Sequence, residues 1–184
     1  MLHCSHFVTG FGTGTVYASD QGVVSVEIPD MSRHETAQLS SISPEYEPSE
    51  ISDLAAGLLL RYFNGERVDF NDIPVVLGGM TPFRQNVLKV IRNLAFGEIC
   101  SYGMVAEECG SPRAARAVGG ALAANPVPVI IPCHRVVASN GLLTGFSAPG
   151  GESTKRALLE MEGVEFKGLL VVTKQLVINR LSLR

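Results

Sequence analysis

An uncharged, proline-broken run between residues 117 and 134 constrains the fold more than any other feature of the sequence. The run contains no Asp, Glu, Lys or Arg, and a membrane-spanning helix needs only about 20 mostly apolar residues. Glycines and prolines nevertheless break it into short pieces, as expected where a backbone turns several times inside a soluble protein. The breaking residues are Gly119, Gly120, Asn125, Pro126, Pro128 and Pro132. We therefore expect a rigid buried segment and no contact with a membrane.

The composition is that of a globular protein of one or two domains. The chain has 184 residues, of which 46% are hydrophobic and 18% are charged. The charge is unevenly placed: the first 80 residues carry three basic and eleven acidic side chains, residues 81–135 carry six and three, and residues 136–184 carry six and four. A basic second part indicates either contact with phosphate or attraction between two domains.

The cysteines and the first residues of the chain indicate a reducing compartment. The four cysteines form no Cys-x-x-Cys pair, so they predict neither disulfides nor a structural zinc site. They are Cys4, Cys100, Cys109 and Cys133. No secretory signal opens the sequence, and we expect a cytoplasmic protein. His3, Cys4 and His6 either hold an adventitious metal or belong to a frayed terminus, and we expect no metal site.

The first 80 residues predict a small α/β domain. β-Branched and aromatic residues predict a hairpin with strands over residues 7–19 and 23–28. After a loop over residues 29–48, Ser49 is predicted to cap a helix that ends near Asn64. Residues 69–80 are typical of a linker because they contain a proline and paired glycines. We therefore predict an N-terminal α/β domain with its linker over residues 1–80 and a second domain over residues 81–184.

Three short helices are predicted after residue 80. Thr81 followed by Pro82 opens the first helix, which ends at Gly97. The second runs over residues 101–109, and the third begins with Ser111 as its cap. The last two helices, joined by a glycine turn, form a helix-turn-helix outline. Such helix pairs also occur in many proteins that never bind DNA.

The third predicted helix has one face of small and cationic residues. Arg113 and Arg116 lie on this face, whereas Ala115, Val118 and Leu122 are predicted to face the core. Alanines and glycines around the arginines leave little side-chain bulk, so a DNA groove could approach the backbone closely. Alternatively, the arginines are only solvated and the small residues serve helix packing.

Cys133 is the candidate nucleophile. The prolines at 126, 128 and 132 push the residues before them toward extended geometry, so the thiol is predicted to follow a stiff, buried backbone segment. A working cysteine needs a neighbouring base or positive charge, because a free thiol with a pKa of about 8.5 is mostly protonated at neutral pH. His134 follows directly, but in an extended strand it faces away, so a bend or a bridging water must join the two. A buried, inert cysteine beside a core histidine is the alternative.

The residues around Cys133 resemble the signature of a known family. Residues 114–137 read AARAVGGALAANPVPVIIPCHRVV and closely resemble the O6-alkylguanine-DNA alkyltransferases, which are single-use DNA-repair proteins. The resemblance continues through FGEICSYG at 96–103, GFS at 145–147 and LLEMEG at 158–163. It implies an α/β (α+β) fold with a small ribonuclease-H-like N-terminal domain that contains a sheet. A mostly helical C-terminal domain with a winged helix-turn-helix would follow.

The resemblance also implies a reaction and the residues that perform it. Cys133 would accept the alkyl group of O6-alkylguanine, and of O4-alkylthymine, in double-stranded DNA. His134 would deprotonate Cys133 through a water, Glu162 would orient His134, and Asn125 would shape the turn before the active-site segment. Contacts with the substrate are implied for Tyr102, Val136, Ser147 and Pro128. Contacts with DNA are implied for Arg116, which would fill the gap left by the flipped nucleotide, and for Gly103, Ser111, Ala115, Gly119 and Ser139. No cofactor is implied, and we expect a monomer.

Two departures from the family pattern concern the loop over the pocket. Phe146 stands where many relatives have Tyr, and residues 148–151 form a longer stretch than the usual Gly-Gly, so the range of alkyl groups admitted stays open. Two other functions also stay open. An alkyltransferase-like protein that binds DNA lesions without transfer would carry Trp at the acceptor position, whereas this chain has Cys133 and no Trp. A cysteine hydrolase would turn over repeatedly.

Overall fold

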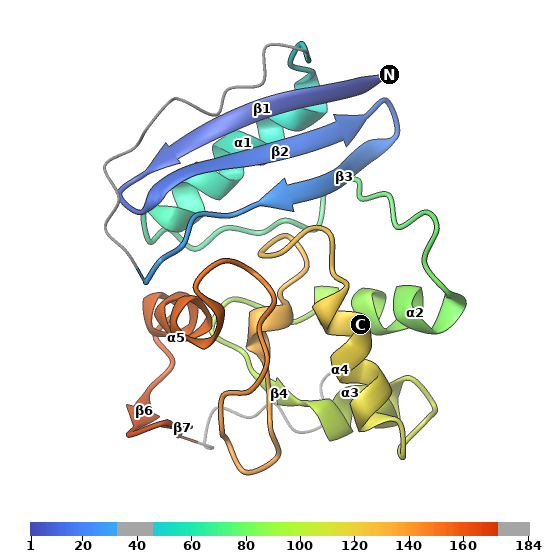
Figure 1. The fold of residues 1–184 in the computed structure, drawn as a ribbon, viewed down its shortest axis with the longest axis vertical. Helices are drawn as coiled ribbons and strands as arrows, with labels where there is room; N and C mark the ends of the chain where they lie inside the picture. Colours follow the sequence, from blue (N-terminus) through green and yellow to red (C-terminus); the bar gives the residue numbers. More distant parts are fainter. Residues whose placement is uncertain (33–45, 173–184) are drawn as a thin grey trace.

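The computed structural model describes residues 1–32 and 46–172, so most of the predicted loop over residues 29–48 lies outside the described residues. The fold is mixed α/β. A three-stranded sheet with one helix lies above a mostly helical second half (Figure 1).

The sheet is an antiparallel meander of three strands in the order β1-β2-β3. Its strands are β1 (Leu2–Thr9), β2 (Gly12–Ser19) and β3 (Gly22–Glu27). The predicted single strand over residues 7–19 is therefore wrong, because the chain turns between Thr9 and Gly12. The Thr9 hydroxyl stabilises this turn by donating to the Gly12 carbonyl and accepting from the backbone N–H of Phe11.

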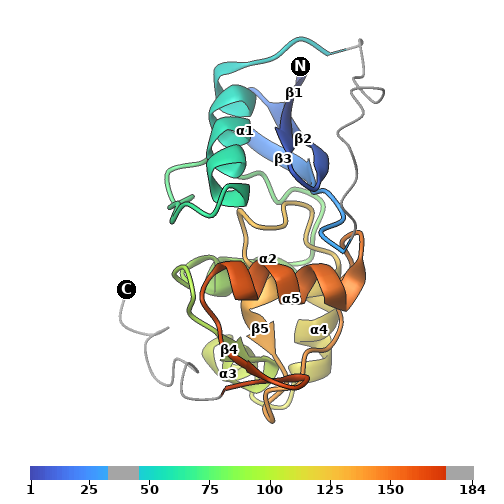
Figure 2. The same ribbon diagram turned by 90° about the vertical axis from the view of Figure 1, so that its left-hand side faces the viewer.

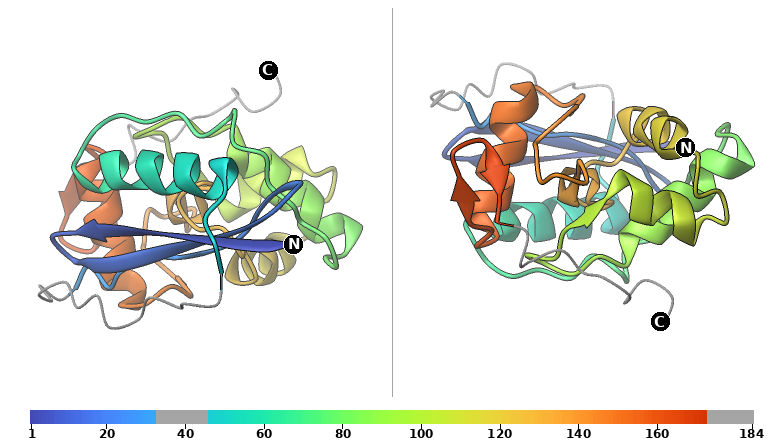
Figure 3. Two further views of the ribbon diagram at one scale, coloured as in Figure 1. Left: turned by 90° about the horizontal axis from the view of Figure 1, so that it is seen from above. Right: turned by 90° about the horizontal axis from the view of Figure 1, so that it is seen from below.

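Helix α1 (Glu50–Phe63) covers one face of the sheet, as the side view and the view from above show (Figures 2 and 3). Ser49 caps the helix as predicted: its hydroxyl accepts from the backbone N–H of Ser52, and the Ser52 hydroxyl accepts from that of Ser49. The chain leaves the helix at Asn64, also as predicted. The apolar face of α1 buries Leu59 and Tyr62 completely.

Part of the predicted linker joins the sheet. The backbone N–H of Val23 in β3 donates to the Pro74 carbonyl, at 2.8 Å, and that of Val76 donates to the Val23 carbonyl, at 2.9 Å. Residues 74–76 thus extend the edge of β3 beyond the three strands, which ties the connecting segment to the first half of the chain.

The second half begins with α2 (Pro82–Arg92), which Thr81 caps as predicted. This helix ends at Arg92, five residues before the predicted end at Gly97. Helix α3 (Tyr102–Glu108), capped by Ser101, and α4 (Ala115–Ala123) follow. The predicted helix start near residue 101 is confirmed, whereas the predicted cap at Ser111 is wrong.

Ser111 does not cap α4. Its carbonyl instead accepts from the N–H of Ala114, at 2.8 Å, and closes a separate turn before the helix begins at Ala115. Pro112 is as compatible with the second position of such a turn as with the first position of a helix. The sequence pattern alone could not separate these two arrangements.

A short parallel strand pair brings distant parts of the second half together. Strand β4 (Cys100–Ser101) pairs with β5 (Val136–Val137), which directly follows the 3₁₀ helix η2 (Cys133–Arg135). The start of α3 therefore lies close to Cys133. Helix α5 (Gly151–Met161) and the hairpin of β6 (Phe166–Lys167) and β7 (Leu170–Val171) complete the described chain.

The main hydrophobic core contains residues from both sides of residue 80. Val16 and Tyr62 from the first half belong to the same buried cluster as Leu88, Ile131 and Leu158 from the second. A smaller cluster around Ile99 and Leu159 lies beside the β6–β7 hairpin. Among the described residues, no helix has both the length and the apolar character that a membrane span requires.

Candidate active site

The segment that leads to Cys133 is buried and holds one rare backbone conformation. Val129, Ile130 and Ile131 are at most 2% exposed, as the proline-flanked sequence predicted. Val129 has a φ of 72°, in the left-handed region that β-branched residues rarely adopt. Such a conformation costs on the order of 1–3 kcal/mol and persists only where the surroundings impose it.

A bend places Cys133 and His134 on a tight turn rather than on an extended strand. Residues 133–135 form η2, in which the N–H of Arg135 donates to the Pro132 carbonyl at 3.0 Å and the N–H of Val136 donates to the Cys133 carbonyl. The sequence left open either a bend or a bridging water between Cys133 and His134, and the structure contains the bend.

Asn125 holds both the thiol and the segment before it. Its side-chain amide donates to the Cys133 sulfur at 3.2 Å and to the Ile131 carbonyl at 2.8 Å, and its oxygen accepts from the N–H of Val127 at 3.1 Å. Burial raises the pKa of the Cys133 thiol, while the Asn125 hydrogen bond and the charge of Lys155 lower it. Asn125 therefore contacts both the candidate nucleophile and the segment that leads to it.

Lys155 is a buried cation that sequence reasoning missed. Its ammonium group donates to the carbonyls of Val136, at 2.7 Å, and Thr144, at 2.9 Å, and lies 5.8 Å from the centre of the Tyr102 ring. Burial lowers the pKa of Lys155 to about 8. The available signal of its burial was the helical spacing of Lys155 with Leu158 and Leu159, which places all three on the buried face of α5.

Glu162 accepts hydrogen bonds from four residues in different parts of the chain. His134 Nε2 lies 2.8 Å from Oε1, and Arg135 binds both oxygens, with Nη2 and Nε each at 2.8 Å. The N–H of Gly97 donates to Oε2 at 3.0 Å, and the Tyr62 hydroxyl donates to Oε1 at 2.5 Å. Burial opposes ionisation of Glu162, but His134 and Arg135 outweigh it and hold its pKa well below the usual range.

His134 is poised as a neutral base. Burial lowers its pKa, although Glu162 acts in the opposite direction. Because a carboxylate only accepts hydrogen bonds, the contact with Glu162 places the proton of the neutral ring on Nε2. Nδ1 is then the basic nitrogen, and this fully buried atom has no hydrogen-bond partner among the described residues. The predicted contact between His134 and Glu162 is thus present.

Tyr62 and Arg135 were not among the predicted site residues. Tyr62 is fully buried on α1, and its hydroxyl lies 3.3 Å from His134 Nε2 as well as 2.5 Å from Glu162. A buried tyrosine usually has a partner for its hydroxyl, but nothing in the sequence shows that the partner stands 100 residues away. Arg135 directly follows the predicted Cys133–His134 pair, and a basic residue beside them was the available signal.

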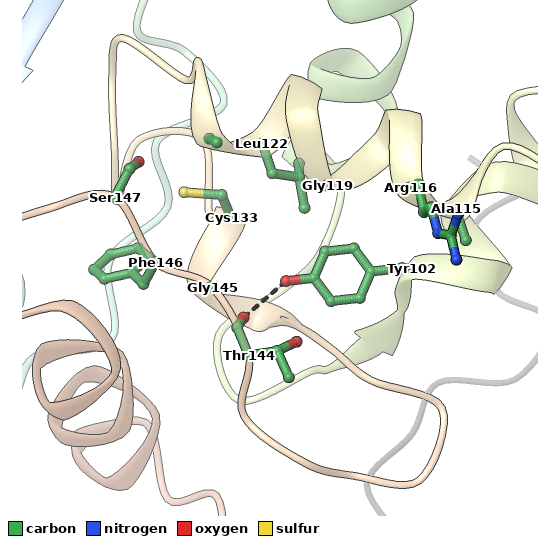
Figure 4. Close-up of a pocket in the computed structure, with 11 residues that line it drawn as sticks. Tyr102, Ala115, Arg116, Gly119, Leu122, Cys133, Thr144, Gly145, Phe146 and Ser147 are labelled. Atoms are coloured by element: carbon green, nitrogen blue, oxygen red, sulfur yellow. Dashed lines mark hydrogen bonds between the residues drawn. The ribbon is translucent and has the colours of Figure 1, made fainter.

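A cavity of about 600 Å³ opens beside the thiol (Figure 4). The Tyr102 ring lies between Cys133 and Arg116, and its hydroxyl donates to the Thr144 carbonyl at 2.9 Å. The exposed Arg116 and the small residues of α4 form one wall, and the 144–147 loop forms another. Six predicted site residues line this cavity: Tyr102, Ala115, Arg116, Gly119, Cys133 and Ser147. Ala115, which the helical pattern assigned to the core, therefore faces the cavity instead.

The other predicted site residues lie outside this cavity. Val136 is fully buried, with its carbonyl bonded to Lys155. Asn125 and Pro128 line a second, smaller cavity that also reaches Cys133. The five remaining residues are not among those that line either cavity: His134, Glu162, Gly103, Ser111 and Ser139.

The N-terminal histidines and cysteine do not converge on one point. His3 Nε2 lies 3.1 Å from an oxygen of Asp20, whereas Cys4 Sγ lies 3.6 Å from His6 Nε2. Alternation along β1 places His3 on the opposite face of the sheet from Cys4 and His6. Within residues 1–32 and 46–172, no three His, Cys, Asp or Glu side chains are grouped so that they could hold a metal. All four cysteines are free thiols.

Comparisons with known proteins point to one family. The model of the 6-O-methylguanine DNA methyltransferase DNA-binding domain matches residues 82–164. A methylated-DNA–protein-cysteine methyltransferase from Metallosphaera sedula is 36% identical over 164 residues, which are 89% of this chain and 94% of that protein. The Haemophilus influenzae protein of the same name is 43% identical over 106 residues, and this match spans only 58% of either chain.

Solved structures agree with these matches. The O6-methylguanine methyltransferase of Mycobacterium tuberculosis superposes with a TM-score of 0.68 at 36% identity, covering 88% of this chain and 93% of that one. A structure of Mycobacterium tuberculosis OGT in complex with DNA gives a TM-score of 0.70 at 33% identity over the same shares. With a 36% identical relative matched over nearly its whole length, the chain belongs to the methylated-DNA–protein-cysteine methyltransferase family.

Proposed function

We propose that this protein repairs DNA by direct reversal, moving the alkyl group of O6-alkylguanine in double-stranded DNA irreversibly to its own Cys133. O4-alkylthymine is a second proposed substrate. The observation that carries the proposal is the placement of the thiol, which lines an open cavity, accepts a hydrogen bond from Asn125 and adjoins the His134–Glu162 pair. Each molecule acts once, because water does not cleave the thioether that results.

The reaction is a displacement at carbon. His134 Nδ1 takes the thiol proton through one water molecule, and the sulfur of Cys133 then attacks the alkyl carbon. The new S–C bond replaces the C–O6 bond, and the leaving guanine takes up a proton. Glu162 holds the tautomer of His134 that this step needs, and Arg135 keeps Glu162 ionised. Asn125 and Lys155 favour the thiolate electrostatically.

Guanine is held in the main cavity by groups around the thiol. Tyr102 hydrogen-bonds the guanine ring, and the backbone of Ser147 meets its oxygen. The carbonyls of Cys133 and Val136 accept from the exocyclic amine. Both carbonyls already accept one hydrogen bond each within the protein, and each keeps a second lone pair for the base. Pro128 contacts the substituent from the second cavity.

DNA lies along α4 with the damaged nucleotide flipped out of the helix. Extruding a base costs about a few kcal/mol in lost stacking and pairing, and Arg116 offsets this by entering the gap. The small residues Ala115 and Gly119 let the minor groove approach closely. Gly103, Ser111 and Ser139 contact the DNA backbone. The Mycobacterium tuberculosis OGT structure, which contains DNA, supports the proposal that this chain binds DNA.

Finer features of the fold and setting are also proposed. The β1–β3 meander with α1 on one face supports a ribonuclease-H-like first domain, and the successive helices α3 and α4 support a winged helix-turn-helix in the second. We place the boundary between the domains at residues 80 and 81. The protein works as a cytoplasmic monomer without a cofactor or metal.

The test is the fate of a labelled alkyl group. DNA that carries labelled O6-methylguanine should transfer its label to the peptide containing Cys133, at no more than one equivalent. A lesion-binding protein of the alkyltransferase-like class would bind the DNA without transfer, and the presence of Cys133 in a chain without Trp speaks against it. Repeated release of product would instead identify a hydrolase.

A further inference from the structure

A further cavity, of about 200 Å³, borders the segment that carries Cys133. Three stretches of the chain contribute to its walls: residues 67–71 after α1, residues 92–96 at the end of α2, and the stretch between residues 129 and 135. Cys133 lines the two cavities of the candidate active site but not this one. A ligand bound here would therefore contact the active-site segment without reaching the thiol.

Guanidinium groups give this cavity its charge. Three arginines line it, and we call it the arginine cavity: Arg67, Arg92 and Arg135. Contacts with other lining residues place the charged ends at the wall. Arg92 Nη2 donates to the Phe70 carbonyl at 3.2 Å, and the Arg67 guanidinium lies 6.0 Å from the centre of the Phe96 ring. Among the described residues that line the cavity, only Asp69 is acidic.

Two of the three arginines have unused hydrogen-bond donors. Arg92 makes its hydrogen bonds, to the carbonyls of residues 70, 71 and 73, through Nη2 alone. Its Nε and Nη1 have no partner within residues 1–32 and 46–172, and the guanidinium of the exposed Arg67 has no hydrogen bond or ion pair there. Burial lowers the pKa of Arg92 and the charge of Asp69 raises it, so a further anion nearby would also stabilise this guanidinium.

Arg135 connects the arginine cavity to the catalytic residues. Its Nη1 donates to the Leu94 carbonyl at the cavity wall, at 2.6 Å, while Nε and Nη2 bind the two oxygens of Glu162, each at 2.8 Å. Glu162 in turn lies 2.8 Å from His134 Nε2. One guanidinium therefore contacts both the cavity and the carboxylate that holds the base.

The size and charge of the cavity fit a small oxyanion. Pockets for drug-sized molecules have volumes of about 300–1,000 Å³, so a cavity of about 200 Å³ suits a smaller group. Guanidinium groups bind both carboxylate and phosphate. A planar carboxylate can be bound by one arginine alone, whereas three guanidinium groups on separate stretches of chain suit the several oxygens of a tetrahedral phosphate.

We propose that the arginine cavity binds a phosphate group, either free or carried by a mononucleotide, and that its occupation slows alkyl transfer through Arg135. The second part of this inference rests on the proposed transfer to Cys133. The first part does not, because phosphate binding is measured without any reaction.

The effect on transfer follows from the contacts of Arg135. A bound phosphate attracts this guanidinium and weakens its hold on Glu162, so the carboxylate stabilises the protonated form of His134 more strongly. Less His134 is then present as the neutral base that takes the thiol proton. Lys155 and Tyr62 also act on His134, but they do not line the arginine cavity and keep their own contacts.

Equilibrium dialysis with radiolabelled inorganic phosphate, at constant ionic strength, tests the binding. We expect wild-type protein to bind one equivalent saturably. Arg67→Glu should weaken binding at least about tenfold, and Asp69→Asn should tighten it, because the first reverses a cation and the second removes the acidic residue. A folding defect would not tighten binding. Arg84→Gln is the matched control, since Arg84 is exposed on α2 but does not line the cavity, and it should bind phosphate as wild type does.

Competition identifies the source of the phosphate group. Deoxyguanosine monophosphate and unlabelled inorganic phosphate are each used to displace the label. Displacement at lower concentrations of the nucleotide would identify a mononucleotide as the ligand, and the reverse order would identify free phosphate.

Transfer rates test the link to the active site. Single-turnover transfer from free O6-alkylguanine base is measured with saturating phosphate and with chloride at equal ionic strength. The free base is used so that competition between phosphate and DNA plays no part. We expect phosphate to slow wild type and Arg84→Gln about fivefold, and to have no effect on Arg67→Glu at the same concentration.

Two results would overturn the inference. Phosphate binding by Arg67→Glu as tight as that of wild type would remove the site, and an unchanged transfer rate at saturating phosphate would remove its link to Cys133. Wild-type protein that accepts no alkyl group even from duplex DNA without phosphate would refute the proposed function instead. The dialysis result would stand in that case, which keeps the failures distinct.

Discussion

Replacing Tyr62 with phenylalanine tests whether the first half of the chain holds the catalytic residues in place. The substitution removes one buried hydroxyl and keeps the ring, whose neighbours Phe63, Phe70 and Phe96 lie at centroid distances of 5.5, 6.0 and 6.1 Å. That hydroxyl donates to ionised Glu162 at 2.5 Å, and a hydrogen bond to a charged group contributes about 1.5–3 kcal/mol. For a chain of this size, that loss corresponds to a fall in Tm of about 3–12 °C.

The same substitution should alter the pH dependence of transfer. Without the Tyr62 donor, Glu162 Oε1 is shared only by His134 and Arg135, so the carboxylate stabilises the imidazolium more strongly. The pKa of His134 then rises toward its ordinary value, a higher pH is needed to make it neutral, and the acid limb of the rate profile moves to higher pH. Single-turnover transfer rates measured across the pH range would show this shift.

Tyr46→Phe is the matched control, because Tyr46 lies on the surface of the same half of the chain. It should leave both Tm and the pH profile unchanged. Equal stability of Tyr62→Phe and Tyr46→Phe would refute the energetic argument. A lower Tm with an unmoved pH profile would confine Tyr62 to a structural role.

Four further predictions follow from the same contacts. Arg116→Ala should slow repair of paired substrate far more than reaction with free O6-alkylguanine base, and equal losses would remove its role in base flipping. Lys155→Met should raise the pKa of Cys133 and slow transfer about tenfold, equivalent to roughly 1.4 kcal/mol, with thiol titration against an alkylating reagent as the check. Glu162→Gln should slow transfer while DNA binding is kept, and should cost about 3–5 kcal/mol of stability because Arg135 loses its buried partner. Because the folded pKa of Glu162 lies below its ordinary 4.5, the stability that this carboxylate contributes in wild type is present above pH 4.5 and is lost as the pH falls toward the folded pKa. Urea unfolding at several pH values should show this loss in wild type and not in Glu162→Gln, and a variant that keeps the loss would contradict the prediction. Alkylated protein should be less stable than free protein by about 1–3 kcal/mol, because the alkyl group adds bulk at a sulfur that is buried and held by Asn125, and an unchanged melting temperature would contradict this.

Local signals in the sequence predicted the helix starts well where a side chain had only one favourable use. Ser49 and Thr81 each cap a helix as expected, and the helix predicted to start near residue 101 begins at Tyr102 with Ser101 as its cap. Ser111 followed by Pro112 fits a turn as well as a helix start, and the turn formed. The first predicted strand ran through the turn after Thr9, although Gly10 and Gly12 mark this position in the sequence.

The candidate site was predictable only in its local part. The candidate nucleophile Cys133 and the rigid, proline-flanked segment before it could be predicted from neighbouring residues in the sequence, and the family resemblance indicated Glu162. The contacts of Tyr62 and Lys155 depend on how separate helices pack, which no spacing rule reports. The second cavity at the thiol is similar, since the end of β3 reaches it through a backbone contact between Val26 and Pro126.

The left-handed backbone at Val129 has a consequence for engineering. Glycine adopts this torsion without penalty, but Val129→Gly would also remove a side chain that is only 1% exposed. The strain relieved, on the order of 1–3 kcal/mol, is matched by the lost burial of the side chain, about 1.5–3 kcal/mol for a valine, so the substitution would not make the protein more resistant to heat. It would loosen the segment that carries Cys133, and valine therefore keeps this segment rigid without a net cost in stability.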